Sequence, residues 1–262
     1  AIDALMKHAQ AWDEIRISGI TNAVSRASIE QYAQAMGLIP QTEFSKPYFW
    51  VDIEGMRPNR DEYLKALSSN TRQKIKRAMK LYAEKGPLQV SLAGSPEEAL
   101  TFLDELKHLH QAYWNRKGQP GAFSTEFSNR FHRNLVANGF ANNQIQLARV
   151  TAGEDAIGIL YNLTNQHHVC NYQAGLVYDE DPRLKPGLVC HTLAIELNIM
   201  LGNKSYDFLM GDSQYKRSLS TQEGMMNWLT LRQKKIRFEI EDVAKQARYK
   251  LHAALRTHDI AG

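Results

Sequence analysis

Apolar side chains recur along this chain with two different periods. Ile157, Ile159, Tyr161 and Leu163 occupy every second position of residues 156–164, which predicts a strand with one apolar face. In other segments the apolar residues recur every three or four positions, which predicts amphipathic helices. Strands are expected at residues 12–20, 46–55, 87–94, 143–150, 156–164, 167–177, 206–212 and 228–238. Helices are expected at residues 1–10, 25–38, 61–86, 95–118, 125–139 and 186–203, and in the charged end of the chain.

Residues that start or stop helices support several of these boundaries. Ser95 stands directly before a helix that opens with Pro, a favoured pair at a helix N-terminus. Gly86, which Pro follows, ends the predicted helix 61–86. Ser25 or Ser28 is the expected cap of the helix at 25–38.

The order of these elements predicts an α/β (mixed α+β) fold. Three consecutive strands between helices indicate a central mixed, mostly antiparallel sheet with helices on both faces. The break around Pro58 predicts a domain boundary, with one domain at residues 1–56 and another at 57–262. Because the chain opens at Ala1 with a predicted helix and strand, we expect it to be a piece of a longer protein.

Composition narrows the class of protein. Of the 262 residues, 43% are hydrophobic and 23% charged, as in ordinary globular proteins. No stretch approaches the ~18 uninterrupted apolar residues of a membrane span, so no membrane association is expected. Cys170 and Cys190 are the only cysteines, which fits a reducing compartment and a cytoplasmic protein. The net charge of +4 permits an anionic ligand without requiring one.

The predicted helix at 186–203 begins with features of an anion site. Gly187 lies in its first turn, where unpaired N–H groups suit a phosphate and the missing side chain lets a ligand approach closely. Arg183 and Lys185 precede it and add positive charge. The same Pro-Gly start is also common in helices that bind nothing.

Polar residues follow the predicted strand at 206–212, where sheets of this kind often bind ligands. Asp212 could orient an amine or accept its proton, and Tyr215 could donate a proton to a departing thiolate. Lys216 could bind a phosphate or stabilise an oxyanion. The alternative interpretation is a turn with a surface Lys–Asp pair.

Two further segments are candidate acceptor-binding surfaces. Arg72 and Lys76 lie on one basic face of a predicted helix, which fits either a polyanion site or an ordinary solvated surface. Trp114, Arg116 and Phe123 surround a Gly/Pro-rich loop, where they could contact an acceptor, although Trp114 could equally anchor the loop to the core.

The sequence lacks the signatures of metal sites, serine nucleophiles and P-loops. The histidine pairs at 108/110 and 167/168 do not have metal-ligand spacing with a carboxylate cluster, so no metal is expected. The chain contains no G-x-S-x-G nucleophile segment and no P-loop.

Taken together, these segments resemble the GNAT superfamily of acyltransferases, in its double-domain CelD-like and FemAB-like branch. The resemblance covers roughly residues 8–237, and its most specific part runs from NYQAGL through the PGL helix start to FLMGDSQYK. The positions that carry it are Tyr172, Gln173, Gly175, Pro186, Gly187, Leu188, Asp207, Phe208, Gly211, Asp212, Tyr215 and Lys216.

The resemblance implies a cytoplasmic bacterial enzyme that takes an acyl group, in particular acetyl, from acyl-CoA. The acceptor would be an amine or hydroxyl of a small molecule or saccharide. The donor pyrophosphate would lie near Lys185–Val189. The residues that bind the donor would be Tyr172, Gln173, Arg183, Lys185, Gly187, Leu188 and Val189. Residues 1–56 would be the end of a first GNAT-like unit, and 57–262 a complete second one. Here the usual glycine-rich pyrophosphate loop is reduced to RLKPGLV, which has a single glycine.

Two alternatives remain open at the level of sequence. FemAB-like relatives take their acyl group from aminoacyl-tRNA, and a nucleic-acid partner would then need a broad basic surface. The helix with Arg72 together with Arg232, Lys234, Lys235 and Arg237 could form one. A non-catalytic GNAT-like binding domain is the other alternative, which the polar residues at 212–216 disfavour.

Overall fold

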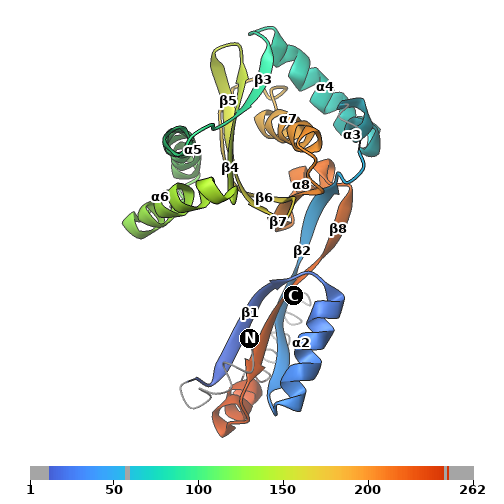
Figure 1. Ribbon diagram of the computed structural model, residues 1–262, viewed down its shortest axis with the longest axis vertical. Coiled ribbons are helices and arrows are strands. Elements are labelled where there is room, and N and C mark those ends of the chain that lie inside the picture. The colour runs from blue at the N-terminus through green and yellow to red at the C-terminus, as the bar shows by residue number, and fades with distance from the viewer. Residues whose placement is uncertain (1–11, 57–59, 245–246, 248–262) are drawn as a thin grey trace, which may run out of the picture. The chain divides into compact units, whose positions relative to one another are not determined.

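The computed structural model describes residues 12–56, 60–244 and 247, and its strands form one eight-stranded sheet in the order β1-β8-β2-β7-β6-β5-β4-β3 (Figure 1). Their bounds are β1 (Glu14–Ile20), β2 (Ile39–Asp52), β3 (Leu88–Leu92), β4 (Ile145–Ala152), β5 (Asp155–Asn165), β6 (His168–Leu176), β7 (Ser205–Met210) and β8 (Gln222–Arg232). The β6–β7 pair is parallel, whereas the registered pairs β1–β8, β2–β7, β3–β4, β4–β5 and β5–β6 are antiparallel. The predicted mixed, mostly antiparallel sheet is confirmed.

The helices also follow the expected order. Their bounds are α2 (Ala23–Ala35), α3 (Arg60–Ala66), α4 (Ser69–Ala83), α5 (Pro96–Arg116), α6 (Glu126–Gly139), α7 (Pro186–Met200) and α8 (Gln214–Leu219), with a short 3-10 helix η2 (Phe140–Asn142). Ser95 caps α5 by accepting the Glu98 N–H, as predicted. In the described part of the chain, no helix is both long and apolar enough to cross a membrane.

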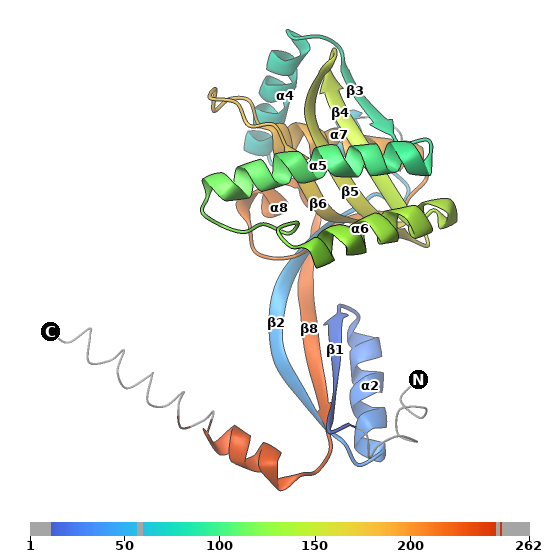
Figure 2. The same ribbon diagram turned by 90° about the vertical axis from the view of Figure 1, so that its left-hand side faces the viewer.

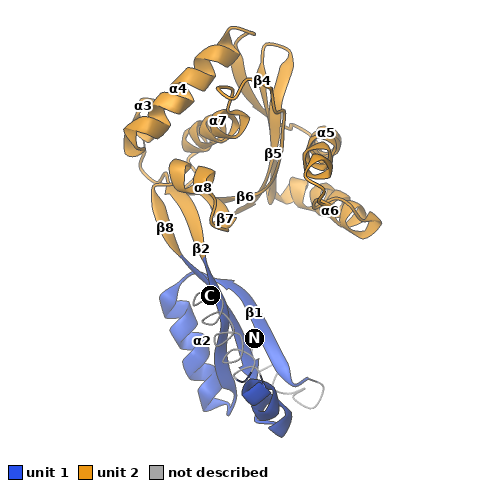
Figure 3. Cartoon of the chain, turned by 180° about the vertical axis from the view of Figure 1, so that it is seen from behind, with its two compact units in different colours: residues 1–46, 225–262 blue, residues 47–224 orange. Residues whose placement is uncertain are grey.

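By its packing the chain divides into two compact units, one of residues 1–46 and 225–262 and one of residues 47–224 (Figure 3). These units do not coincide with a division at residue 56. The assignment of residues 1–56 to a first GNAT-like unit therefore stays a prediction, and the helix expected at 1–10 lies outside the described residues.

In the larger unit, helices cover both faces of the strands β4 to β6 (Figure 2). On one face, α5 and α6 bury Leu103, Leu106 and Val136 against Ile159 and Tyr161. The other face packs against α4 and α7. The fully buried members of that second core include Val51, Ile75, Ala78, Val150, Leu160, Val169, Val189, Ala194, Ile195 and Tyr206.

The smaller unit has its own, smaller core. Ala33 near the end of α2 and Leu38, which follows that helix, pack with Leu231 of β8. Arg232 is buried beside them and forms ion pairs with Glu14 at 3.5 Å and Asp242 at 3.0 Å. Burial of a charged guanidinium is tolerated because these two carboxylates neutralise it.

Several predicted boundaries were wrong, each for a local reason. The helix expected at 61–86 is two helices, because the Ser68 side chain accepts the Thr71 N–H and starts a new helix at Ser69. The cap of α2 is Asn22, not Ser25 or Ser28. The last strand ends at Arg232 rather than 238, and residues 236–244 are helical.

One buried hydrogen bond joins α3 to the end of α8. The Tyr63 hydroxyl, fully buried, donates to the Leu219 carbonyl at 2.7 Å. We expect Tyr63→Phe to lower the free energy of unfolding by about 1–3 kcal/mol, because the Leu219 carbonyl loses its partner inside the core. Urea denaturation followed by circular dichroism measures this, and an unchanged midpoint and slope would contradict it.

Candidate active site

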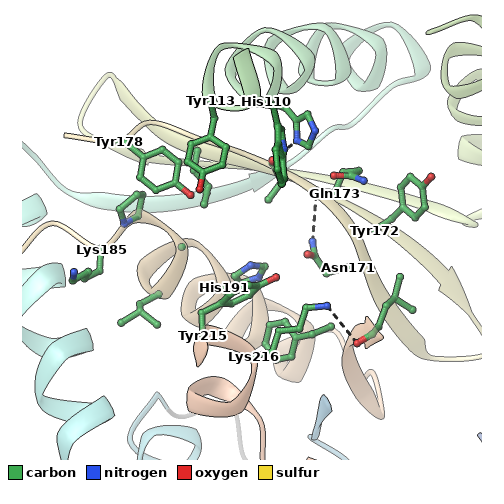
Figure 4. A pocket seen from close by; sticks show the side chains of 18 of the residues that line it. His110, Tyr113, Asn171, Tyr172, Gln173, Tyr178, Lys185, His191, Tyr215 and Lys216 are labelled. Carbon is green, nitrogen blue, oxygen red and sulfur yellow. Dashed lines mark hydrogen bonds between the residues drawn. The ribbon is translucent and has the colours of Figure 1, made fainter. Parts of the chain in front are cut away.

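The parallel strands β6 and β7 separate shortly after they pair. Their register is His168–Ser205, Val169–Tyr206 and Cys170–Asp207, and no pairing follows among the described residues. A cavity of about 790 Å³ lies beyond this point, between residues 171–176 of β6 and residues 208–210 of β7. The separated strands therefore leave a gap within the sheet that a ligand can enter (Figure 4).

The N-terminus of α7 borders the cavity. Pro186, Gly187 and Leu188 line it, and no side chain caps this end of the helix. The Val189 N–H bonds back to the Lys185 carbonyl at 3.1 Å, so the Gly187 and Leu188 N–H groups precede the first helical hydrogen bond. These two donors, the helix dipole and the exposed Lys185 suit a phosphate or pyrophosphate.

A bulge shapes the β7 side of the cavity. Tyr48 of β2 pairs with Met210 and Trp50 with Asp207, so β7 carries one extra residue between these pairs. Leu209 has φ +59°, a conformation that costs a non-glycine residue about 1–3 kcal/mol. Its N–H donates to the Asp207 carboxylate at 2.6 Å. Burial raises the pKa of Asp207, and this hydrogen bond partly opposes the rise.

The side chain of Lys216, in α8, contacts the same bulge of β7. Its ammonium donates to the Met210 carbonyl at 2.7 Å and to the Leu209 carbonyl at 3.4 Å. Burial lowers the pKa of Lys216, and the nearby Asp207 partly offsets this. An ammonium has three hydrogens, so one donor remains for a ligand in the cavity.

Tyr215 lies beside Lys216 and stacks on the ring of His191, with centroids 5.7 Å apart and planes 12° apart. Burial raises the pKa of Tyr215 to about 12, and the neighbouring Tyr178 adds to the shift. The phenol is therefore protonated at neutral pH and can donate a proton within the cavity.

Aromatic side chains form the opposite side of the cavity. Tyr113 of α5 stacks on Tyr178 with centroids 4.8 Å apart, and Trp114 lies edge-on to Tyr113. His110 fixes this side in place, because its Nε2 accepts the Ala122 N–H at 3.2 Å while its Nδ1 lies 3.3 Å from the Ala174 carbonyl. Figure 4 shows Tyr113 and Tyr178 facing His191, Tyr215 and Lys216 across the cavity.

The structure brings many of the residues selected from the sequence to this one cavity. They come from β6, α7, α8 and α5, which are far apart in the chain. The cavity-lining members are Trp114, Tyr172, Gln173, Lys185, Gly187, Leu188, Tyr215 and Lys216.

Other selected residues lie elsewhere. Asp212 is exposed outside the cavity lining and holds Arg217 through contacts of 2.6 and 2.5 Å, which keep the pKa of Asp212 low. Arg183 binds Asp181 in the same way. Val189 and Phe123 are both buried in hydrophobic cores, at 0% and 3% exposure, so their side chains contact no ligand.

The basic face of α4 and Arg116, the last residue of α5, also lie outside the cavity lining. Arg72 points back to the Leu64 carbonyl at 3.4 Å, and Lys76 lies 3.8 Å from Asp61. Arg116 is exposed, and its charge lowers the pKa of Tyr178 slightly against the effect of burial. Arg116 is therefore near the aromatic side of the cavity without lining it.

Sequence reasoning missed several lining residues. His191 stands four positions after Gly187, on the same face of the helix, and that spacing could have identified it. Tyr113 and Asn171 directly precede residues that were selected. Tyr178 gave no signal, because its place depends on the loop between β6 and α7. No cluster of three or more His, Cys, Asp or Glu side chains suited to a metal occurs among the described residues.

Comparison with known proteins gives one family match. The model of the acetyltransferase (GNAT) domain matches residues 69–217, which include every cavity-lining residue. Comparison with curated protein sequences finds no match.

Solved structures share the fold at low sequence identity. FemX has a TM-score of 0.62 at 13% identity, covering 87% of this chain and 76% of its own. A conserved protein of unknown function from Bacteroides thetaiotaomicron has a TM-score of 0.60 at 11% identity, with 89% and 74% covered. The C-terminal domain of a putative lysylphosphatidylglycerol synthetase from Agrobacterium fabrum has 0.58 at 10%, with 88% and 72% covered.

Proposed function

Because the chain belongs to the GNAT acetyltransferase family, we propose that it transfers an acyl group, in particular acetyl, from acyl-CoA. The acceptor is an amine or hydroxyl of a small molecule or saccharide. The observation that carries this proposal is the cavity between the separated strands β6 and β7, which places an uncapped helix N-terminus and a Tyr–Lys pair around one space.

The two ends of the cavity fit the two ends of such a donor. Lys185 and the N–H groups of Gly187 and Leu188 suit the pyrophosphate, because they combine positive charge with free backbone donors. Tyr215 and Lys216 would then lie at the thioester. The single glycine of this turn is sufficient for close approach, since it stands where the free N–H groups of α7 border the cavity.

The chemistry needs few groups. The acceptor nitrogen or oxygen attacks the thioester carbonyl carbon, a C–N or C–O bond forms, and the C–S bond breaks. Tyr215 gives its proton to the departing thiolate and regains one from the acceptor, so the phenol is regenerated. Lys216 donates its remaining hydrogen bond to the carbonyl oxygen as that oxygen becomes anionic. Asp212 takes no part, because Arg217 occupies it outside the cavity.

The aromatic side of the cavity supports an acceptor that carries a ring. Tyr113, Tyr178 and Trp114 present flat apolar faces on which a sugar or other small ring can pack, while the nearby polar groups bind its substituents. Cys170 and Cys190 are both free thiols, which supports a reducing, cytoplasmic location.

The alternative donor is an aminoacyl-tRNA, which the structural similarity to FemX suggests. Part of the basic surface it would need is neutralised: Lys235 and Arg237 both bind Asp13, and Arg232 is buried in its own ion pairs. This distribution of charge supports the thioester donor. Transfer from aminoacyl-tRNA but from no acyl-CoA would overturn that choice.

Tyr215→Phe tests the proposed chemistry. We expect kcat for release of free CoA from acetyl-CoA, with amino sugars or other amines as acceptors, to fall about 100-fold. Donor affinity should change little, because the ring still stacks on His191. A colorimetric thiol assay measures the rate, and His108→Gln, an exposed change on α5 outside the cavity lining, is the control. A wild-type chain that binds donors but never transfers would favour a binding domain.

A further inference from the structure

A buried network of amide side chains runs from the cavity into the core. Asn171, which lines the cavity, donates to the Asn162 oxygen at 2.9 Å. Asn162 donates in turn to Gln146 at 2.8 Å, and Gln146 donates to Asn198 of α7 at 3.0 Å. All four residues are buried. Because each amide has a defined donor and acceptor, the network fixes the orientation of every member.

Tyr206 joins this network to His191. Burial raises the pKa of Tyr206, and its side-chain contact with Asn162 acts in the opposite direction. The Tyr206 hydroxyl lies 3.1 Å from His191 Nδ1. A phenol O–H is a stronger donor than a neutral imidazole N–H, and an imidazole nitrogen is a stronger acceptor than a phenol oxygen, so the phenol hydrogen is directed to Nδ1. His191 Nδ1 therefore accepts a hydrogen bond, and the proton of the neutral ring lies on Nε2.

His191 remains neutral over the whole physiological range. Burial lowers the pKa of His191 to about 3, and the nearby Lys216 ammonium contributes in the same direction. Nε2 has no hydrogen-bond partner among the described residues, yet it is not one of the fully enclosed unpaired atoms. Since His191 lines the cavity, its Nε2–H is directed into the ligand space.

A lone N–H donor in a mostly apolar cavity needs an acceptor, because leaving it unpaired costs free energy. Tyr215 stacks on the same ring. Lys216 directly follows Tyr215 in the chain, and its ammonium is near enough to His191 to lower the pKa of that ring. Two donors of different kinds, an ammonium and a neutral imidazole, thus approach the space next to the phenol. This arrangement suits a carbonyl oxygen that gains negative charge during reaction.

We infer that His191 is a second oxyanion donor, which binds the carbonyl oxygen of the acyl donor through Nε2–H while Tyr206 fixes its tautomer. This inference rests on the proposed function and extends it. His191 acts by polarising the carbonyl and transfers no proton. Tyr206 is a positioning residue, since it reaches the substrate only through His191.

The tautomer can be measured without any activity. In the full chain labelled with ¹⁵N-histidine, the His191 resonances, assigned by their loss in His191→Gln, should show an unprotonated Nδ1 and a protonated Nε2 at pH 7. In Tyr206→Phe the two tautomers should both be populated. A wild-type His191 protonated at Nδ1 would overturn the inference.

Kinetics then separates a donor from a base. Gln carries an N–H donor at nearly the place of Nε2 but cannot act as a base, so His191→Gln should keep kcat within about 10-fold of the wild type. His191→Leu should lower kcat about 100-fold with a small change in KM. Tyr206→Phe should lower kcat about 10-fold, and His108→Gln should not change it.

Other outcomes would contradict the role of His191 in distinct ways. If Leu and Gln reduce kcat equally, the ring acts as a base or by packing alone. Should His191→Leu be folded and fully active, the residue has no part in the reaction. If the wild-type chain transfers nothing from any donor, the proposed function fails first, and the measured tautomer then describes a binding site only.

Discussion

Lys216→Met should lower kcat for acyl transfer by about 1,000-fold, with KM for the donor changed only a few-fold. The ammonium lies half-buried against the bulge of β7, bound to the Met210 and Leu209 carbonyls. Its third hydrogen is a charged donor at a half-buried position, where such a contact stabilises developing charge more strongly than in bulk water. Met fills a similar volume, so the fold is preserved. Single-turnover release of CoA measures the effect.

The matched control for this change is Lys204→Met. Lys204 is exposed and pairs with Glu54 at 3.0 Å, outside the cavity lining, so its loss should leave kcat within twofold. Lys216→Arg tests geometry as well as charge, because a planar guanidinium cannot repeat the compact three-donor contact. A Lys216→Met variant that keeps wild-type kcat would remove Lys216 from the reaction.

Gly187→Glu should weaken acyl-CoA binding by about 1,000-fold, measured by calorimetric titration. The new carboxylate would occupy the free N–H groups of the first turn of α7 and repel the phosphates. The helix itself should tolerate the change, since a carboxylate is favourable near its N-terminus. A Cβ at position 187 would come within 3.4 Å of the Leu176 side chain, so a small shift of that side chain is sufficient.

Gly187→Ala separates the effect of size from that of charge. It adds the same Cβ without the carboxylate, so we expect a loss of only about 10-fold. Equal losses for Ala and Glu would mean that close approach alone matters. No loss with Glu would place the donor phosphates elsewhere and remove the pyrophosphate site at α7.

Much of the fold could be predicted from the sequence because its signals were local. The alternation at Ile159 and Tyr161 and the Ser95 cap identified β5 and α5. Ser68 caps α4 and so divides the helix expected at 61–86 into two. This short-range signal was overlooked because basic and apolar residues alternate at helical spacing through the whole segment. Helix α8 has only six residues, too few for a periodic pattern, and so no helix was predicted there.

Parts of the candidate site that lie within one helix or strand could be predicted from the sequence. Parts that depend on contacts between distant segments could not. The Pro-Gly start of α7 indicated an anion site, and the cavity does border it. Asp212 was selected for its chemistry, but the ion pair with Arg217 depends on the turn into α8. His191 of α7 acquires its proposed role only through Tyr206, which lies on β7.

At Leu209, the residue that would be most stable differs from the residue that shapes the cavity. Selection for thermal stability alone would favour Gly or Asn there, because both adopt a positive φ at lower cost. Leucine instead lines the cavity and sets the carbonyl that receives Lys216. A change to Gly or Asn chosen for heat resistance alone would therefore alter the backbone at the point where the sheet meets the proposed reacting groups.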